Sequence, residues 1–354
     1  MQNFFKPFFP ALGRDNNFDI LRVLAAALVI WGHGWELTRT PGEPLILLSQ
    51  AALAGAPLGV WIFFFISGYL VSESFQARSL LAFIEARFLR IYPAFLVSLL
   101  FGVIIGACAT TLPLMDYVSN EYTWRYIYRS LLTDIQFNLP GVYATLPFAN
   151  GINGSLWTIP IEMMMYVGVV IAGLLTLLRR PTWALLVIAG LMTWLALDPA
   201  KALLIPRVTQ VFVLPAVMCF ALGMLFYTNR ARIPLHALGV LAIIGLIILT
   251  NKTQPPGNIF VCIAIAYTIA WLAFHPRFRI KIPARFGDIS YGLYVYAFPI
   301  QQTVIYNVSG IGPWTLSVVA FSITAVVAWL SWHGIEKRAL ALKGRLVRDG
   351  LRRG

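Results

Sequence analysis

The chain has 354 residues, of which 59% are hydrophobic and 12% are charged, and its formal net charge at pH 7 is +13. A soluble globular domain carries about twice that share of charged residues. The apolar residues also fall in long runs, so the composition excludes an ordinary soluble enzyme and predicts an all-α, polytopic membrane protein. No basic stripe with interleaved aromatic residues occurs away from the predicted helix ends, so we expect no nucleic-acid partner.

Taken in chain order, the apolar runs predict ten membrane spans of about 17–25 residues each. The run within 38–56 is broken by Pro and Gly and is not expected to span. No small-residue cleavage site follows the first run, so we expect it to be retained as a span. The predicted spans lie near residues 18–37, 57–73, 91–112, 155–178, 182–198, 208–228, 233–250, 258–275, 287–306 and 313–335.

The Lys and Arg residues predict which side each connection occupies. With the N-terminus inside, the inner segments hold 20 of the 27 Lys and Arg residues and the outer segments hold 6, while Arg22 lies within a span. Because cytoplasmic loops carry the excess of positive charge, both termini are expected in the cytoplasm. We expect one domain over 1–354, with a core at 17–340 and a basic cytoplasmic tail at 337–354 that binds anionic lipid headgroups.

The first span carries two polar residues that hydrocarbon disfavours, Arg22 and His33. Eleven residues separate them, which is about three helical turns, so they share one face and lie roughly 16 Å apart along the axis. Arg22 is expected near the cytoplasmic headgroups and His33 in the outer third of the bilayer. An arginine that reaches to the headgroups and a histidine bonded to a neighbouring helix are the structural alternatives.

Two carboxylates are candidate partners for His33. Glu162, in "NGSLWTIPIEMMMY", is expected at a similar depth on another helix, and Glu36 lies one turn after His33 on the same helix. A carboxylate can fix the tautomer of an imidazole and raise its basicity, which favours general-base chemistry. A structural pair that joins two helices is the alternative.

Two further stretches hold polar residues at span ends. Arg87 and Arg90, in "FIEARFLRIYP", lie one turn apart at the inner mouth of the third span, where such a pair can bind phosphates or act only as a topology signal. Tyr291, Tyr294 and Gln301 lie in "GDISYGLYVYAFPIQQ" of the ninth span, where hydrogen bonds between helices are the alternative to substrate binding. Three cysteines, without CxxC spacing, predict neither a disulfide framework nor a metal site.

These motifs, in this order, resemble the acyltransferase 3 family of integral membrane acyltransferases over residues 17 to 340. The resemblance rests on Arg22-x10-His33, "FFFISGYLVS", Arg87-x-x-Arg90 followed by "IYP", "SLWTIPIEMMMY", "ISYGLYVYAFP" and the closing "GIEKR". Two positions depart from it. Ala297 stands where many members have a histidine, which puts a second histidine role in doubt, and Arg338 stands where many have proline.

The resemblance implies an O-acyltransferase of a bacterial plasma membrane that moves acetyl from cytosolic acetyl-CoA to a hydroxyl of an extracytoplasmic carbohydrate. His33 would act as general base, oriented by Glu162 or Glu36. The donor's phosphates would bind Arg22, Arg87 and Arg90, and the substrates would contact Trp157, Tyr291, Tyr294 and Gln301. No metal is expected. A transporter of a small solute or acyl group is the alternative from another class, although no repeat relates the two halves of the chain.

Overall fold

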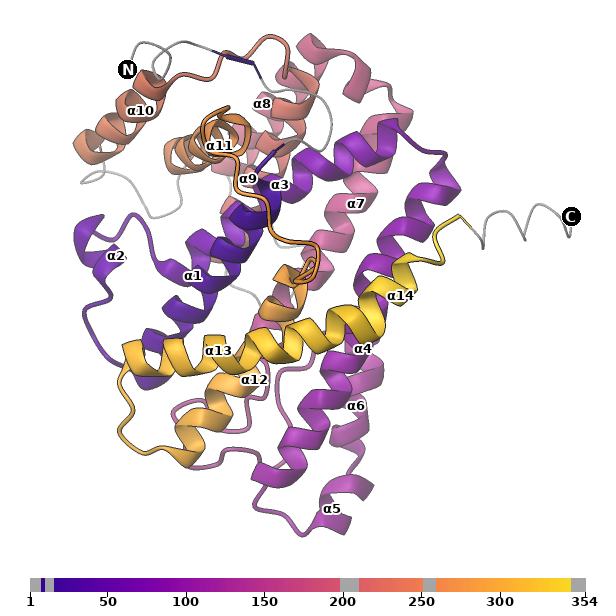
Figure 1. The fold of residues 1–354 in the computed structure, drawn as a ribbon, viewed down its shortest axis with the longest axis vertical. Helices are drawn as coiled ribbons and strands as arrows, with labels where there is room; N and C mark the ends of the chain where they lie inside the picture. The colour runs from indigo at the N-terminus through magenta and orange to yellow at the C-terminus, as the bar shows by residue number, and fades with distance from the viewer. Residues whose placement is uncertain (1–7, 10–15, 198–209, 251–258, 345–354) are drawn as a thin grey trace, which may run out of the picture. The chain divides into compact units, whose positions relative to one another are not determined.

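The structure is a computed structural model that describes residues 8–9, 16–197, 210–250 and 259–344. Within these residues the chain forms helices, with isolated β-bridges and no named strand, which confirms the predicted all-α class (Figure 1). The outer part of the predicted tail, from 345, lies outside the described residues, as do span edges at 198, 208–209 and 258.

A helix overlaps each of the ten predicted spans. These helices are α1 (Phe18–Thr38), α3 (Gly55–Gln76), α4 (Leu80–Ala109), α7 (Thr158–Leu174), α8 (Pro181–Leu197), α9 (Gln210–Thr228), α10 (Ala237–Thr250), α11 (Ile259–Phe274), α12 (Ser290–Asn307) and α13 (Pro313–Ser331). Shorter helices occupy the connections and the end of α13, namely α2 (Pro44–Leu48), α5 (Leu114–Ser119), α6 (Glu121–Leu131) and α14 (Lys337–Leu340).

Fewer than ten helices are long and apolar enough, by length and composition alone, to count as membrane spans. Among the described residues, five helical segments are long and apolar enough to cross a membrane, and they contain α1, α3, α4, α7 and α13. Three more apolar helices are shorter. Helix α12 is outside both groups, and it carries Gln301 and Gln302, whose side chains are buried within the protein.

The helix that contains the third predicted span begins before that span. Helix α4 begins at Leu80, where the hydroxyl of Ser79 accepts a hydrogen bond from the backbone N–H of Ala82. The helix continues through Arg87, Arg90 and Pro93 instead of beginning near Pro93. Two arginines lower the hydropathy of this segment without interrupting its helical backbone, so an apolar run marks the membrane-embedded part and misses the helix that precedes it.

The described chain forms two compact units. Unit 1 comprises 1–25, 42–78 and 161–282, and unit 2 comprises 26–41, 79–160 and 283–354. The single domain predicted for 1–354 stays a prediction.

Unit 1 is built around the close packing of α3 on α9. A Cβ atom at Gly68 would overlap the carbonyl oxygen of Phe220, and one at Gly223 would overlap that of Phe65. Glycine at both positions therefore lets the two backbones touch, which is how helices gain van der Waals contact in a membrane. The need for Gly68 explains why a glycine interrupts the apolar stretch "FFFISGYLVS".

Unit 2 is built around α12, which packs against α13 and α4, while α6 lies along α4 (Figure 1). Helix α6 is amphipathic, with Tyr126 buried and Trp124 and Tyr128 exposed, as an interfacial segment requires. The loop that follows α6 contacts α12, where the Tyr143 hydroxyl is 2.7 Å from that of Thr303. Burial raises the pKa of Tyr143 to about 12, so this hydroxyl stays neutral.

Contacts between connections agree with the predicted alternation of sides. In unit 1 the Asn17 side chain donates to the carbonyls of Leu272 and Phe278, so two predicted inner segments meet. In unit 2 the backbone N–H of Gly344 donates to Glu85, again joining inner segments. Predicted outer segments meet likewise. Arg39, in one outer segment, donates to the carbonyl of Pro147 in another. Gln302, in the outer half of the ninth predicted span, donates to the carbonyls of Phe148 and Gly151 in that same outer loop.

Candidate active site

Helix α1 carries both polar residues of the first span without interruption. The 11-residue spacing of Arg22 and His33 therefore spans about 16 Å of a continuous helix, as the sequence predicts. Arg22 forms an ion pair with Asp19, one turn earlier on the same helix. His33 lies in the part of α1 that belongs to unit 2.

Phe298 of α12 is the aromatic neighbour of His33. The two rings meet edge to face, with centroids 5.3 Å apart and an interplanar angle of 82°. Phe298 also lies against Gly154, because a Cβ atom there would approach its ring to 2.8 Å. One side chain of α12 thus contacts both the histidine of α1 and the loop that leads into η1 (Gly154–Trp157) and α7.

Ser155 is held by both of its backbone groups. Its N–H donates to Oδ1 of Asn153 at 3.1 Å, and its carbonyl accepts the hydroxyl of Tyr294 at 2.7 Å. Asn153 is itself fixed, since its amide donates to the carbonyl of Val295 at 2.8 Å. The Tyr294 hydroxyl also lies 2.9 Å from that of Thr158. This part of the chain is therefore rigidly attached to α12.

Gln301 joins α12 to α1. Its side-chain Nε2 donates to the carbonyl of Ile30 at 2.7 Å. Helical carbonyls point toward the helix C-terminus, so this bond brings the carboxamide toward the turn of α1 that contains His33. Tyr294, Phe298 and Gln301 have i, i+4, i+7 spacing and therefore occupy one face of α12.

Besides the indole nitrogens of Trp31 and Trp35 and Oε1 of Gln302, three buried polar atoms close to Phe298 in the sequence or in contact with its neighbours have no hydrogen-bond partner among the described residues. They are Nδ1 of His33, Oγ of Ser155 and Oε1 of Gln301. Ser155 is 1% exposed and Gln301 is 0% exposed. A buried polar atom without a partner costs about 1–3 kcal/mol. A polar ligand bound between α1, η1 and α12 would recover that cost.

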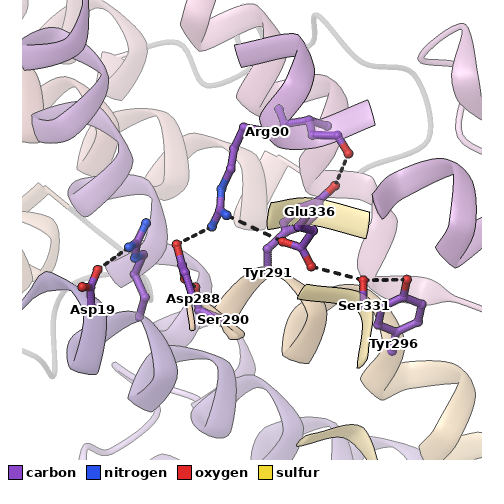
Figure 2. A network of polar contacts seen from close by, with 10 residues as sticks. Asp19, Arg90, Asp288, Ser290, Tyr291, Tyr296, Ser331 and Glu336 are labelled. Atoms are coloured by element: carbon purple, nitrogen blue, oxygen red, sulfur yellow. Dashed lines mark hydrogen bonds and ion pairs between the residues drawn. The ribbon is translucent and has the colours of Figure 1, made fainter. Parts of the chain in front are cut away.

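A second polar cluster surrounds Arg90 (Figure 2). Its guanidinium lies 2.8 Å from the carboxylate of Asp288 and 3.6 Å from that of Glu336, which is 2% exposed. Ser290 donates to Asp288, and Ser331 donates to Glu336 and lies 3.2 Å from the hydroxyl of Tyr296. Two carboxylates thus neutralise the arginine that the sequence predicts as a phosphate ligand.

A π-helical turn, η5 (Trp332–Glu336), places Glu336 in this cluster. Such a turn widens the helix by one residue and is often found at functional sites. It continues α13 into α14 as one rod (Figure 1). The predicted phosphate ligand Arg87 lies one turn before Arg90, with its guanidinium 5.8 Å from the ring centroid of Phe83.

The remaining predicted residues are found as follows. Glu162 belongs to unit 1, where its carboxylate accepts hydrogen bonds from Ser67 and Tyr166. Its predicted pairing with His33 stays a prediction. Glu36 is exposed on α1, and Trp157 is half-buried at the end of η1. Tyr291 donates its hydroxyl to the carbonyl of Ile91 at 3.2 Å.

The sequence reasoning missed Ser155, Asp288 and Glu336. Ser155 and Glu336 lie inside motifs that carry the family resemblance, so their position in "SLW" and "GIEKR" was an available signal. Asp288 pairs with Arg90 across 198 positions of sequence, and nothing in a single sequence indicates that partner. In the described part of the chain, no group of three His, Cys, Asp or Glu residues is arranged to hold a metal ion.

The comparisons with known proteins agree with this picture. A family model described as an acyltransferase domain, that of the acyltransferase 3 family, matches residues 15–333. The chain is 29% identical to the O-acetyl transferase of Shigella phage Sf6, over 92% of the chain and 96% of that relative. It is 28% identical to nodulation protein 10 of Rhizobium leguminosarum bv. viciae, over 95% of the chain and 96% of that relative.

A third relative is longer than the chain. Peptidoglycan O-acetyltransferase OatA of Listeria monocytogenes serovar 1/2a is 26% identical over 90% of the chain and 55% of that relative. No solved structure matches the chain. The family match covers most of the chain, and several of its helices are long and apolar enough to span a membrane. The chain therefore belongs to the acyltransferase 3 family and is a multi-pass membrane acyltransferase.

Proposed function

We propose that the protein is an O-acetyltransferase of a bacterial plasma membrane. It moves acetyl from cytosolic acetyl-CoA to a hydroxyl of an extracytoplasmic carbohydrate, with His33 as general base. The names of two relatives, an O-acetyl transferase and a peptidoglycan O-acetyltransferase, support acetyl as the group and a carbohydrate as the acceptor. The observation that carries the proposal is the buried Nδ1 of His33, which has no hydrogen-bond partner in the described residues.

On the donor side, Arg22 lies at the predicted inner end of the helix that also carries His33. Its partner Asp19 is exposed, so a donor phosphate would compete with that carboxylate for the guanidinium. The axial distance of about 16 Å between the two residues is comparable with the reach of the pantetheine arm of CoA. Phosphates bound near Arg22 would therefore allow the thioester to approach His33. Arg87 stays a predicted phosphate ligand. Arg90 is better assigned to fixing α4 against α12 and η5, since two carboxylates already neutralise it.

The proposed reaction is direct transfer. The acceptor oxygen attacks the thioester carbonyl carbon and forms a C–O bond, while its proton passes to Nδ1 of His33. The tetrahedral intermediate then collapses, the C–S bond breaks, and the proton on His33 is returned to the sulfur, which leaves as the free thiol of CoA. Each turnover consumes one thioester and one hydroxyl and releases one ester and one thiol.

The two tyrosines predicted as substrate contacts donate their hydroxyls elsewhere, so they are not the oxyanion donors. Tyr294 donates to the carbonyl of Ser155, and Tyr291 donates to that of Ile91. Both hydroxyls therefore position backbone segments. The developing negative charge on the carbonyl oxygen requires a different donor.

The test uses the detergent-purified protein with acetyl-CoA and a mixture of simple sugars. His33→Ala should abolish release of CoA thiol and formation of sugar ester while leaving the thermal unfolding midpoint nearly unchanged. His236→Ala, a histidine at the start of α10 in unit 1, is the control and should keep activity. In cells that carry His33→Ala in place of the wild type, mass spectrometry should show surface glycans lighter by about 42 daltons per site, the mass added by acetyl transfer to a hydroxyl. Activity retained by His33→Ala would exclude the general-base role.

A further inference from the structure

We infer that the acceptor is a polyol bound through two of its hydroxyl groups, by His33 and Gln301, and that Ser155 binds the carbonyl oxygen of the acetyl group. The inference rests on the proposed function and assigns its substrate contacts. It starts from the three buried atoms without partners, Nδ1 of His33, Oγ of Ser155 and Oε1 of Gln301.

The neighbourhood is defined by contacts within unit 2. Phe298 touches the His33 ring at a centroid distance of 5.3 Å and lies against Gly154, which directly precedes Ser155. Gln301 follows Phe298 by one turn and is bonded to Ile30, one turn before His33. The three atoms thus belong to α1, η1 and α12, and Phe298 contacts the first of these helices and the residue before Ser155.

The available atom of Gln301 is an acceptor. A carboxamide has an NH2 group that donates and an oxygen that accepts. The carbonyl of Ile30 can only accept, so the nitrogen must face it, and Oε1 is the atom left without a partner. The general base must also present a lone pair to the acceptor hydroxyl. The site therefore offers two hydrogen-bond acceptors.

Two acceptors require two donors on the ligand. A hydroxyl that donates to Nδ1 of His33 becomes the nucleophile, and a second hydroxyl of the same molecule donates to Oε1 of Gln301. A monohydric alcohol can satisfy only the first and would leave a buried acceptor without a partner, which a hydrogen-bonding site penalises strongly. Neighbouring hydroxyls of a sugar or cyclitol provide this pattern.

Ser155 has the properties of the missing oxyanion donor. Both of its backbone groups are bonded, it is 1% exposed, and its hydroxyl has no partner in the described chain. A hydroxyl can donate where a carbonyl oxygen gains negative charge. During attack it would hold that oxygen without giving up its proton, so the balance of the transfer step is unchanged.

The test compares two probe acceptors with acetyl-CoA as donor, cis-cyclohexane-1,2-diol and cyclohexanol. The wild type should transfer acetyl to the diol at least about tenfold more efficiently, in kcat/KM, because the diol satisfies Gln301. Gln301→Met should remove most of that preference by raising the KM for the diol alone.

Ser155→Ala should lower kcat by about 100-fold or more for both probes, as loss of an oxyanion donor does, with little change in KM. The matched control is Thr324→Val. Thr324, on α13 of unit 2, is also fully buried with a hydroxyl that lacks a partner, but it is outside this neighbourhood. It should keep wild-type kinetics with both probes.

Equal efficiency with both probes in the wild type would overturn the polyol assignment and leave the proposed function standing. Equal kcat in Ser155→Ala and Thr324→Val would overturn the role of Ser155. If neither probe is acetylated, the proposed reaction fails for these probes. The inferred contacts are then tested by the shift that each probe causes in the unfolding midpoint. The diol, but not cyclohexanol, should then raise the unfolding midpoint of the wild type and not of Gln301→Met, and equal shifts would overturn it.

Discussion

Arg90 shows how one buried charge organises the inner end of unit 2. Its partners Asp288 and Glu336 come from the start of α12 and from η5, and all three side chains are largely buried. Burying an ion in a low-dielectric interior is costly unless its partner stays in place. Removing all three charges should therefore destabilise the protein less than removing the arginine charge alone.

Arg90→Gln should lower the free energy of unfolding by about 3–5 kcal/mol, because it leaves two buried carboxylates without their cation. Adding Asp288→Asn and Glu336→Gln should restore much of that loss. Thermal unfolding of the purified variants in detergent measures both effects. An unfolding midpoint for Arg90→Gln equal to that of the wild type would show that the arginine is dispensable for stability.

At the scale of helices, the contact of α3 with α9 depends on two glycines. Gly68→Ala should destabilise the protein, because the new methyl group overlaps the backbone carbonyl of Phe220 and cannot be accommodated by a rotamer change. Gly190→Ala is the matched control. Gly190 lies within α8 of the same unit, and a Cβ atom there meets nothing within 4 Å.

We expect Gly68→Ala to lower the unfolding midpoint by several degrees and Gly190→Ala to leave it unchanged or raise it, since alanine favours a helix by up to about 1 kcal/mol over glycine. Circular dichroism during heating gives both midpoints. Equal behaviour of the two variants would contradict the close packing of α3 on α9.

Helix existence was predictable from the sequence, and helix ends and contacts were less so. A helix overlaps each predicted span because about 17–25 apolar residues can do little else in a bilayer. The beginning of α4 was missed since hydropathy responds to lipid and not to backbone conformation. The spacing of Arg22 and His33 predicted that one helix carries both, as α1 does, and their roles stay predictions. The partners of Arg90 and the hydrogen bonds that hold Ser155 are tertiary contacts, and such contacts could not be predicted from a single sequence.

For the whole molecule, the sidedness of every connection follows from one count of charges. The contacts within each unit agree with the alternation, but the choice of which side is cytoplasmic rests on Lys and Arg alone. An error of one span would reverse every later segment, so a single accessibility experiment tests the whole arrangement.

Single cysteines introduced as Tyr128→Cys and Arg78→Cys should react oppositely with a membrane-impermeant maleimide, after Cys108, Cys219 and Cys262 are replaced by alanine. Both positions are exposed, on α6 and after α3 respectively. Position 128 should be labelled in intact spheroplasts, and position 78 only after the membrane is permeabilised. Labelling of position 78 in intact spheroplasts would refute a cytoplasmic N-terminus.

The π-turn at Trp332–Glu336 also bears on the ancestry of the chain. A π-turn holds one residue more than the α-turn it replaces, and one residue corresponds to about 100° of rotation about the helix axis. Deleting Gly334 would restore a regular α-helix and carry Glu336 and everything after it around the axis by that angle. A single codon gained or lost in this segment would thus decide whether Glu336 faces Arg90. Relatives that differ in length here are expected to lack this ion pair or to form it from another position.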